Sequence, residues 1–96
     1  MLENLTIESF AGHRGSTFRL VADEAVGFDM TLADVTPLGD SGVRQAFSLI
    51  FHAPLAAPIM PQRIYRLEQS ELGAIDLFVV PLGPKSGAFR YEVIFT

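Results

Sequence analysis

The chain contains no cysteine among its 96 residues. Disulfide bonds, thiolate zinc sites and a cysteine nucleophile are therefore excluded. Charged residues are also scarce, at 19% of the sequence, while hydrophobic residues make up 49%. Because a disordered chain or a coiled coil needs far more charge, the composition predicts a folded globular protein. A chain of this length is expected to form a single domain over residues 1–96.

Positive charge is sparse and scattered. Lys85 is the only lysine, the arginines form no run, and the net charge is −4. Nucleic acids and membrane surfaces attract basic patches, so neither is expected as a partner. No apolar stretch approaches the roughly 20 residues of a membrane span, and the N-terminus lacks the basic and apolar regions of a signal peptide. The expected location is cytoplasmic.

Residues 5–11 are expected to form a short helix. Thr6 suits the position that caps its N-terminus, because its hydroxyl can accept a bond from a free backbone N–H. Leu5 and Phe10 have the spacing of an apolar contact across that cap, and Gly12 is expected to end the helix. A helix of two turns is unstable alone, so it must pack against the rest of the chain.

The remaining sequence alternates between apolar and polar residues, which is typical of half-buried strands. The alternation slips at residues 33–35 and predicts a bulge there. Short strands with frequent turn signals predict a mainly β fold, a six-stranded antiparallel barrel or roll with one short N-terminal helix. The six expected strands are Ser16–Ala22, Ala25–Pro37, Arg44–Ala53, Gln62–Gln69, Ala74–Leu82 and Ala88–Thr96.

The last three strands allow a prediction of register. A hairpin turning through residues 70–73 places Arg66 opposite Asp76, as an ion pair. A second hairpin turning through residues 83–87 places Val79 opposite Val93 and Leu77 opposite Phe95. A slip by one residue would scatter the apolar side chains, so the pattern selects this register. The face that it gathers consists of Tyr65, Leu67, Ile75, Leu77, Val79, Tyr91, Val93 and Phe95.

The opposite face of these strands carries an apolar stripe, which consists of Ile64, Phe78, Val80 and Ile94. Monomeric proteins rarely leave large apolar patches bare, so two interpretations remain. In the first, other segments cover the stripe: either the N-terminal region, through Leu2, Leu5, Ile7 and Phe10, or the proline-rich connection of residues 54–61, through Leu55, Ile59 and Met60. In the second, the stripe or that connection binds a protein partner or a second copy, with register set by Arg66, Asp76, Arg90 and Glu92.

Motifs that could carry chemistry are weak. Gly39-Asp40-Ser41-Gly42 resembles the nucleophile segment of chymotrypsin-like serine proteases, but the chain is too short for that fold and the composition is that of an ordinary loop. Residues 12–17 have the glycines of a phosphate loop without its lysine or preceding strand, so a turn that ends the helix is the better interpretation. His13 and His52 have no further ligand at metal-binding spacing. No catalytic residue, cofactor or metal is predicted, and the protein is not expected to be an enzyme.

Several segments resemble a known family. The most specific are Tyr65-Arg66-Leu67-Glu68, Glu71-Leu72-Gly73 and Phe78-Val79-Val80-Pro81-Leu82-Gly83-Pro84. Over essentially its whole length the chain is similar to a family of small bacterial all-β proteins classed as a domain of unknown function. The resemblance implies no catalytic residues, and it implies an association with phage-tail-collar-like proteins.

The function expected from these observations is that of a non-enzymatic protein-interaction or structural module, an accessory of a phage-tail-like assembly. The alternative is a small-ligand-binding β-barrel, in which the inward residues line a cavity. The many phenylalanine and leucine residues on the inward faces favour a filled interior over such a cavity.

Overall fold

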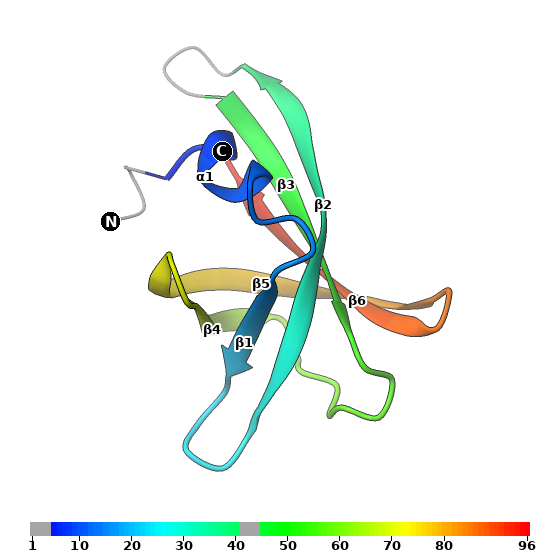
Figure 1. The fold of residues 1–96 in the computed structure, drawn as a ribbon. Coiled ribbons are helices and arrows are strands. Elements are labelled where there is room, and N and C mark those ends of the chain that lie inside the picture. Colours follow the sequence, from blue (N-terminus) through cyan, green and yellow to red (C-terminus); the bar gives the residue numbers. More distant parts are fainter. Residues whose placement is uncertain (1–4, 41–44) are drawn as a thin grey trace.

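The computed structural model describes residues 5–40 and 45–96. In this part of the chain the helix α1 (Ile7–Ala11) is followed by β1 (Thr17–Val21), β2 (Gly27–Asp40), β3 (Gln45–Ala53), β4 (Arg63–Gln69), β5 (Gly73–Lys85) and β6 (Ala88–Phe95). The strands form a closed antiparallel barrel in the order β1-β2-β3-β6-β5-β4, and β4 returns to pair with β1 (Figure 1). The predicted fold, mainly β with six antiparallel strands and one short N-terminal helix, is confirmed.

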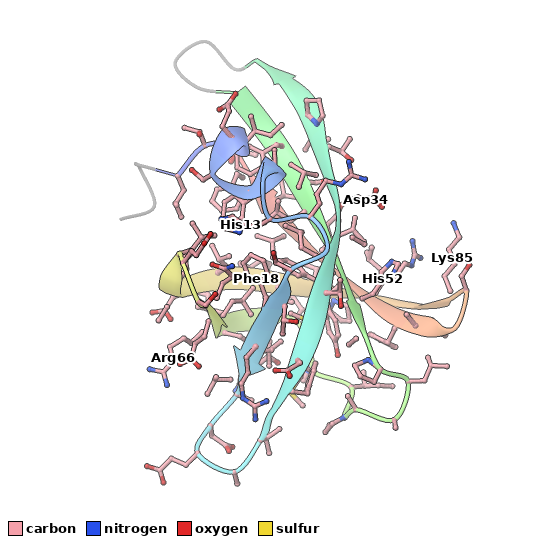
Figure 2. The ribbon with its side chains drawn as sticks, in the orientation of Figure 1. His13, Phe18, Asp34, His52, Arg66 and Lys85 are labelled. Atoms are coloured by element: carbon pink, nitrogen blue, oxygen red, sulfur yellow. The ribbon has the colours of Figure 1, made fainter. Side chains whose placement is uncertain are left out.

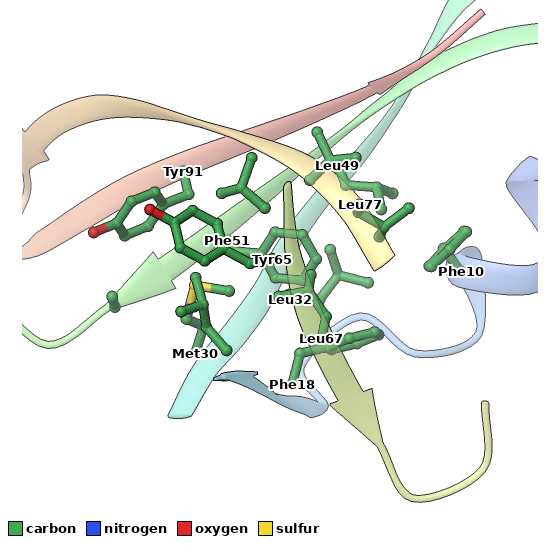
Figure 3. Packing of buried hydrophobic residues seen from close by; sticks show 14 of the residues in the cluster. Phe10, Phe18, Met30, Leu32, Leu49, Phe51, Tyr65, Leu67, Leu77 and Tyr91 are labelled. Atoms are coloured by element: carbon green, nitrogen blue, oxygen red, sulfur yellow. The ribbon is translucent and has the colours of Figure 1, made fainter. Parts of the chain in front are cut away.

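Alternating side chains fill the barrel. Along β1, for example, Phe18 and Leu20 are buried while Thr17 and Arg19 are exposed, as the period of two requires. The face predicted for the last three strands is buried, with Ile75 only partly so. Each fully buried large apolar side chain contributes roughly 1.5–3 kcal/mol to folding. Figure 3 shows the result, an interior occupied by packed phenylalanine, tyrosine, leucine and methionine side chains.

The short helix α1 closes one end of the barrel. Thr6 caps it, and the Thr6 backbone N–H donates to Ser9 Oγ at 3.0 Å, so the helix begins at Ile7 rather than Leu5. Phe10 is fully buried, with its ring centroid 5.4 Å from that of Phe95 and 6.0 Å from that of Phe47. Tertiary packing of Phe10, with Ile7 partly buried beside the core, therefore supplies the stability that so short a helix lacks.

The connection between β3 and β4 lies at the end of the barrel where the two tyrosines point. The Met60 backbone N–H donates to the Tyr91 hydroxyl at 3.0 Å, and the Tyr65 hydroxyl donates to the Pro61 carbonyl oxygen. Met60 also packs in part against the core, while Leu55 and Ile59 remain 58% and 66% exposed. Two directional hydrogen bonds thus fasten a proline-rich segment that keeps apolar side chains in solvent.

Within the described residues, three bulges interrupt the long strands, and one of them lies between Pro37 and Gly39, where β2 pairs with β3. The pairing of β2 with β3 shifts between Leu32 and Asp34, which confirms the predicted bulge. The pairing of β5 with β6 shifts between Pro81 and Gly83, and β5 continues to Lys85, past the expected turn at residues 83–87. The loop needs only two residues, Ser86 and Gly87, because both have positive φ (55° and 85°), as in the tight turns that match the twist of a hairpin.

The registers of the last three strands follow the prediction, with one difference. Arg66 lies opposite Asp76, and Val80 lies opposite Glu92, which is the predicted register in both hairpins. Pairing of β5 with β6 ends at Val80, however, so the expected pairs Val79–Val93 and Leu77–Phe95 are not formed. Before that point β5 pairs with β4, whereas β6 continues along β3.

Candidate functional site

The outer face of β4 and β5 carries the centre of the predicted apolar stripe. Ile64 and Phe78 lie directly opposite each other in the two strands. Their side chains are 65% and 50% exposed. Residues opposite each other on one face of an antiparallel pair have neighbouring side chains, so these two form one apolar contact in solvent. A cross-strand pair of this size on the outside of a barrel adds nothing to the core.

The other two members of the stripe are placed differently. Val80 follows Phe78 on the same face of β5 and is partly buried. Ile94 is 52% exposed on β6, where it lies opposite Ser48 of β3. Because the pairing of β5 with β6 stops at Val80, Ile94 has no paired neighbour on β5. The structure therefore brings Ile64 and Phe78 together, with Val80 beside them, and leaves Ile94 on a separate strand pair.

The segments considered as covers for the stripe lie elsewhere. Phe10 is inside the barrel, and Leu5 and Ile7 pack against the core. Leu2 lies outside the described residues. Leu55 and Ile59 project into solvent from the β3–β4 connection, and Met60 is held against Tyr91. The interpretation in which the helix or the connection covers the stripe is wrong for Ile64 and Phe78, because both side chains remain exposed while Phe10 packs inside the barrel.

A shallow hollow of about 380 Å³ lies beside this pair. Its carboxylates come from Asp23 and Glu24, in the turn after β1, and from Asp76 on β5. Pairing of Val21 with Arg66 brings this turn next to β4. No local pattern in the sequence predicts that this turn borders the stripe. We call this region, lined by residues 21–24, 64–66 and 76, the acidic hollow.

The positive charge in the acidic hollow is already paired. Arg66 Nε lies 3.2 Å from Glu68 Oε2, so the predicted ion pair of Arg66 with Asp76 is wrong although the register is right. Glu68 lies two residues along the same strand and therefore projects from the same face, where its carboxylate reaches the guanidinium. Both side chains are about half exposed, so the pair contributes little to stability. Asp76 is left as an unneutralised carboxylate, since the described residues place no cation within salt-bridge distance of it.

The glycine-rich segment after α1 is the expected helix-ending turn. Gly12 caps the helix, and the Ser16 N–H donates to the His13 carbonyl oxygen at 2.9 Å. The His13 ring lies 3.2 Å from Gln69 Nε2 and 3.6 Å from a Glu71 carboxylate oxygen. The His13 side chain thereby joins this turn to the β4–β5 hairpin.

The remaining motifs add no chemical site. Gly39-Asp40-Ser41-Gly42 extends beyond the described residues, so the serine considered as a nucleophile cannot be placed. Across residues 5–40 and 45–96 no three histidine, aspartate or glutamate side chains are grouped as a metal site would require. Within the same ranges no helix has the length and apolar character needed to cross a membrane.

Comparison with known proteins supports one part of the resemblance, that to a small domain of unknown function. Residues 5–95 match the family described as "Domain of unknown function (DUF6916)". No curated protein and no solved structure matches the chain. Because the match extends over nearly the entire sequence, the chain belongs to this family of unknown function.

Proposed function

We propose that the protein is a non-enzymatic interaction module that binds a partner protein through the outer face of β4 and β5. The single observation that supports this is the exposed cross-strand pair of Ile64 and Phe78, which no packing within the barrel requires. Exposed aromatic and aliphatic side chains that are set together are typical anchors of protein interfaces. The sequence resemblance suggests that the partner is a bacterial component of a phage-tail-like assembly.

The charge around this pair specifies the chemistry of the partner. The acidic hollow has three carboxylates, from Asp23, Glu24 and Asp76, and its one arginine is already paired with Glu68. A partner that places an apolar side chain on Phe78 and a lysine or arginine in the hollow would match both features. We therefore expect a basic and apolar partner segment.

Self-association through the same face is less favourable. In a two-fold dimer the same patch lies on both sides, so each acidic hollow would approach the other or its immediate surroundings. Like charges brought together in a desolvated contact cost several kcal/mol. The net charge of −4 adds to this repulsion. The purified protein is therefore expected to be monomeric.

Capture experiments with paired variants test the proposal. The protein, tagged and produced at its native level, is compared with the double variant Ile64→Ser/Phe78→Ser. Leu38→Ser serves as the matched control, because Leu38 is 51% exposed on β2 and lies outside the proposed surface. We expect one stoichiometric partner with the original chain and with the control, lost in the double variant and weakened by Asp76→Asn. Equal capture by the double variant would refute the proposal.

Mass spectrometry of the captured protein tests the finer part. A tail-assembly component with a basic, apolar contact segment is the expected result, and a partner of another kind would remove the assembly role while keeping the interaction. Light scattering of the purified protein over a concentration series tests self-association. A dimer that Ile64→Ser/Phe78→Ser abolishes would show that this face binds a second copy instead of a partner protein.

A further inference from the structure

A second hollow lies on another part of the barrel surface, where β2 and β3 meet the β5–β6 hairpin. Its volume is about 230 Å³. Figure 2 shows Asp34, His52 and Lys85, which come from β2, β3 and β5, on this side of the molecule. We call this region the basic groove, and its lining consists of Asp34, Ile50, His52, Lys85, Ser86 and Arg90.

Strand pairing explains why these side chains gather there. His52 of β3 lies opposite Arg90 of β6, and Arg90 lies opposite Gly83 of β5. Gly83 has no side chain, and a Cβ atom built on it would meet nothing within 4 Å, so the space beside Arg90 is open. The tight turn at Ser86 and Gly87 joins β5 to β6 beside this space. Lys85 and Ser86 therefore belong to the lining.

Two of the three bulges in the described strands border the basic groove. The bulge of β2 falls between Leu32 and Asp34, which pair with the residues just before His52. The bulge of β5 falls between Pro81 and Gly83, next to Arg90. Bulges bend a strand locally and redirect side chains, and they are over-represented next to functional sites. These two bulges thus shape the wall beside His52 and Arg90.

The cations of the basic groove lack protein partners. Among the described residues, neither Lys85 nor Arg90 takes part in an ion pair. The Arg90 Nε atom is buried and has no hydrogen-bond partner in that part of the chain. An unsatisfied buried donor is costly, and two like charges sharing one hollow repel each other. An anion bound between the Lys85 ammonium and the exposed part of the Arg90 guanidinium would relieve this repulsion.

The acidic groups nearby do not supply that anion. Asp34, the carboxylate in the lining, has an oxygen 3.9 Å from Arg14 Nη2, on the side chain of another segment. Glu92 follows Arg90 at the next outward position of β6, opposite Ile50 and Val80, and lies outside the lining. The groove therefore has an excess of positive charge on a chain whose net charge is −4.

We propose that the basic groove binds a phosphate group, held by the Arg90 guanidinium and the Lys85 ammonium, with the Ser86 hydroxyl as a further donor. A phosphate monoester carries nearly two negative charges and three acceptor oxygens, which matches two cations and a hydroxyl that come from separate positions. A carboxylate has two oxygens, and the fork of one arginine satisfies it. The site does not depend on the partner surface proposed for β4 and β5.

Titration with inorganic phosphate at fixed ionic strength tests the proposal, with the backbone amide signals of Ser86, Gly87 and Arg90 as the readout. We expect saturable shifts at these amides. Arg90→Gln and Lys85→Gln should each weaken binding about tenfold, because each removes a charge-assisted hydrogen bond. Arg19→Gln is the matched control, since Arg19 is about half exposed and pairs with Asp29 on another strand pair, and it should leave binding unchanged.

The outcomes separate clearly. Lys85 is exposed, so Lys85→Gln keeps the fold even if Arg90→Gln disturbs the β5–β6 hairpin. The absence of saturable shifts, or equal affinity in Lys85→Gln and the original chain, would overturn the proposal. Acetate is titrated in parallel, and binding of acetate at the same amides with equal affinity would show a general carboxylate site and overturn the assignment to phosphate.

Discussion

The two ends of the barrel are closed by different kinds of interaction. At one end α1 inserts Phe10 among apolar rings, including a stacked pair of Phe47 and Phe95 whose centroids are 4.5 Å apart. At the other end Tyr65 and Tyr91 bind backbone groups of the β3–β4 connection through their hydroxyls. The first closure depends on filling the interior with apolar side chains, and the second depends on hydrogen bonds of defined direction. We therefore expect the helix end to contribute more to stability, and the tyrosine end to control the position of one segment.

Removal of the Phe10 ring should have the largest effect. Phe10→Ala leaves a cavity at the helix end and is expected to lower the free energy of unfolding by about 3–5 kcal/mol. Denaturant unfolding measures this change. Phe78→Ala is the matched control, because it removes the same atoms from a side chain that is already 50% exposed. It should lower the free energy of unfolding by less than about 1 kcal/mol. Similar losses in the two variants would show that α1 does not close the barrel through Phe10.

Loss of the Tyr91 hydroxyl should have a smaller and more local effect. Tyr91→Phe keeps the buried ring and removes the acceptor of the Met60 N–H, so we expect a loss of about 1 kcal/mol. Hydrogen exchange at the Met60 amide should accelerate, because the loop then opens without disturbing the core. Unchanged exchange at Met60 would mean that packing, and not this hydrogen bond, holds the connection in place.

Alkaline pH should have the smallest effect, again at the tyrosine end. Burial raises the pKa of the Tyr65 phenol above its ordinary value of 10.0, and the nearby Arg63 charge offsets part of this rise. The fold therefore favours the neutral phenol, so this contribution to stability is complete below pH 10 and is lost as pH rises through the raised pKa. Phenolate absorbance in a Tyr91→Phe background follows Tyr65 alone. A midpoint at or below the ordinary value would contradict the burial of this hydroxyl.

The position of α1 at the barrel end could not be predicted from the sequence. Phe10 and its spacing from the cap predicted that the short helix must pack on something, yet not on which surface. The same apolar side chains of the helix could either cover the outer stripe or close the barrel end. No local sequence pattern distinguishes these two positions of the helix. The acidic hollow was missed for a related reason, because Asp23 reaches Ile64 only through the pairing of β1 with β4.

The ion pair predicted for Arg66 shows a second limit. Period-two alternation determined which residues face Arg66 across the hairpin, and Asp76 was placed correctly. It did not determine which carboxylate the long guanidinium side chain would choose, and Glu68 of the same strand is within reach. Similarly, glycine and proline at residues 83–84 indicated a turn, but a two-residue turn at Ser86 and a bulge let β5 continue through both.

The amino-acid sequence by itself determined the six strands, the bulge near Asp34 and the register of both C-terminal hairpins. Each of these follows from alternation over a few consecutive residues, since a strand with one buried face accepts only one register. The closure of β1 onto β4, the placement of α1 at the barrel end and the separation of β5 from β6 at Val80 were decided by the tertiary structure. These contacts join distant segments, and the free energy that selects among them comes from the packing of the whole interior.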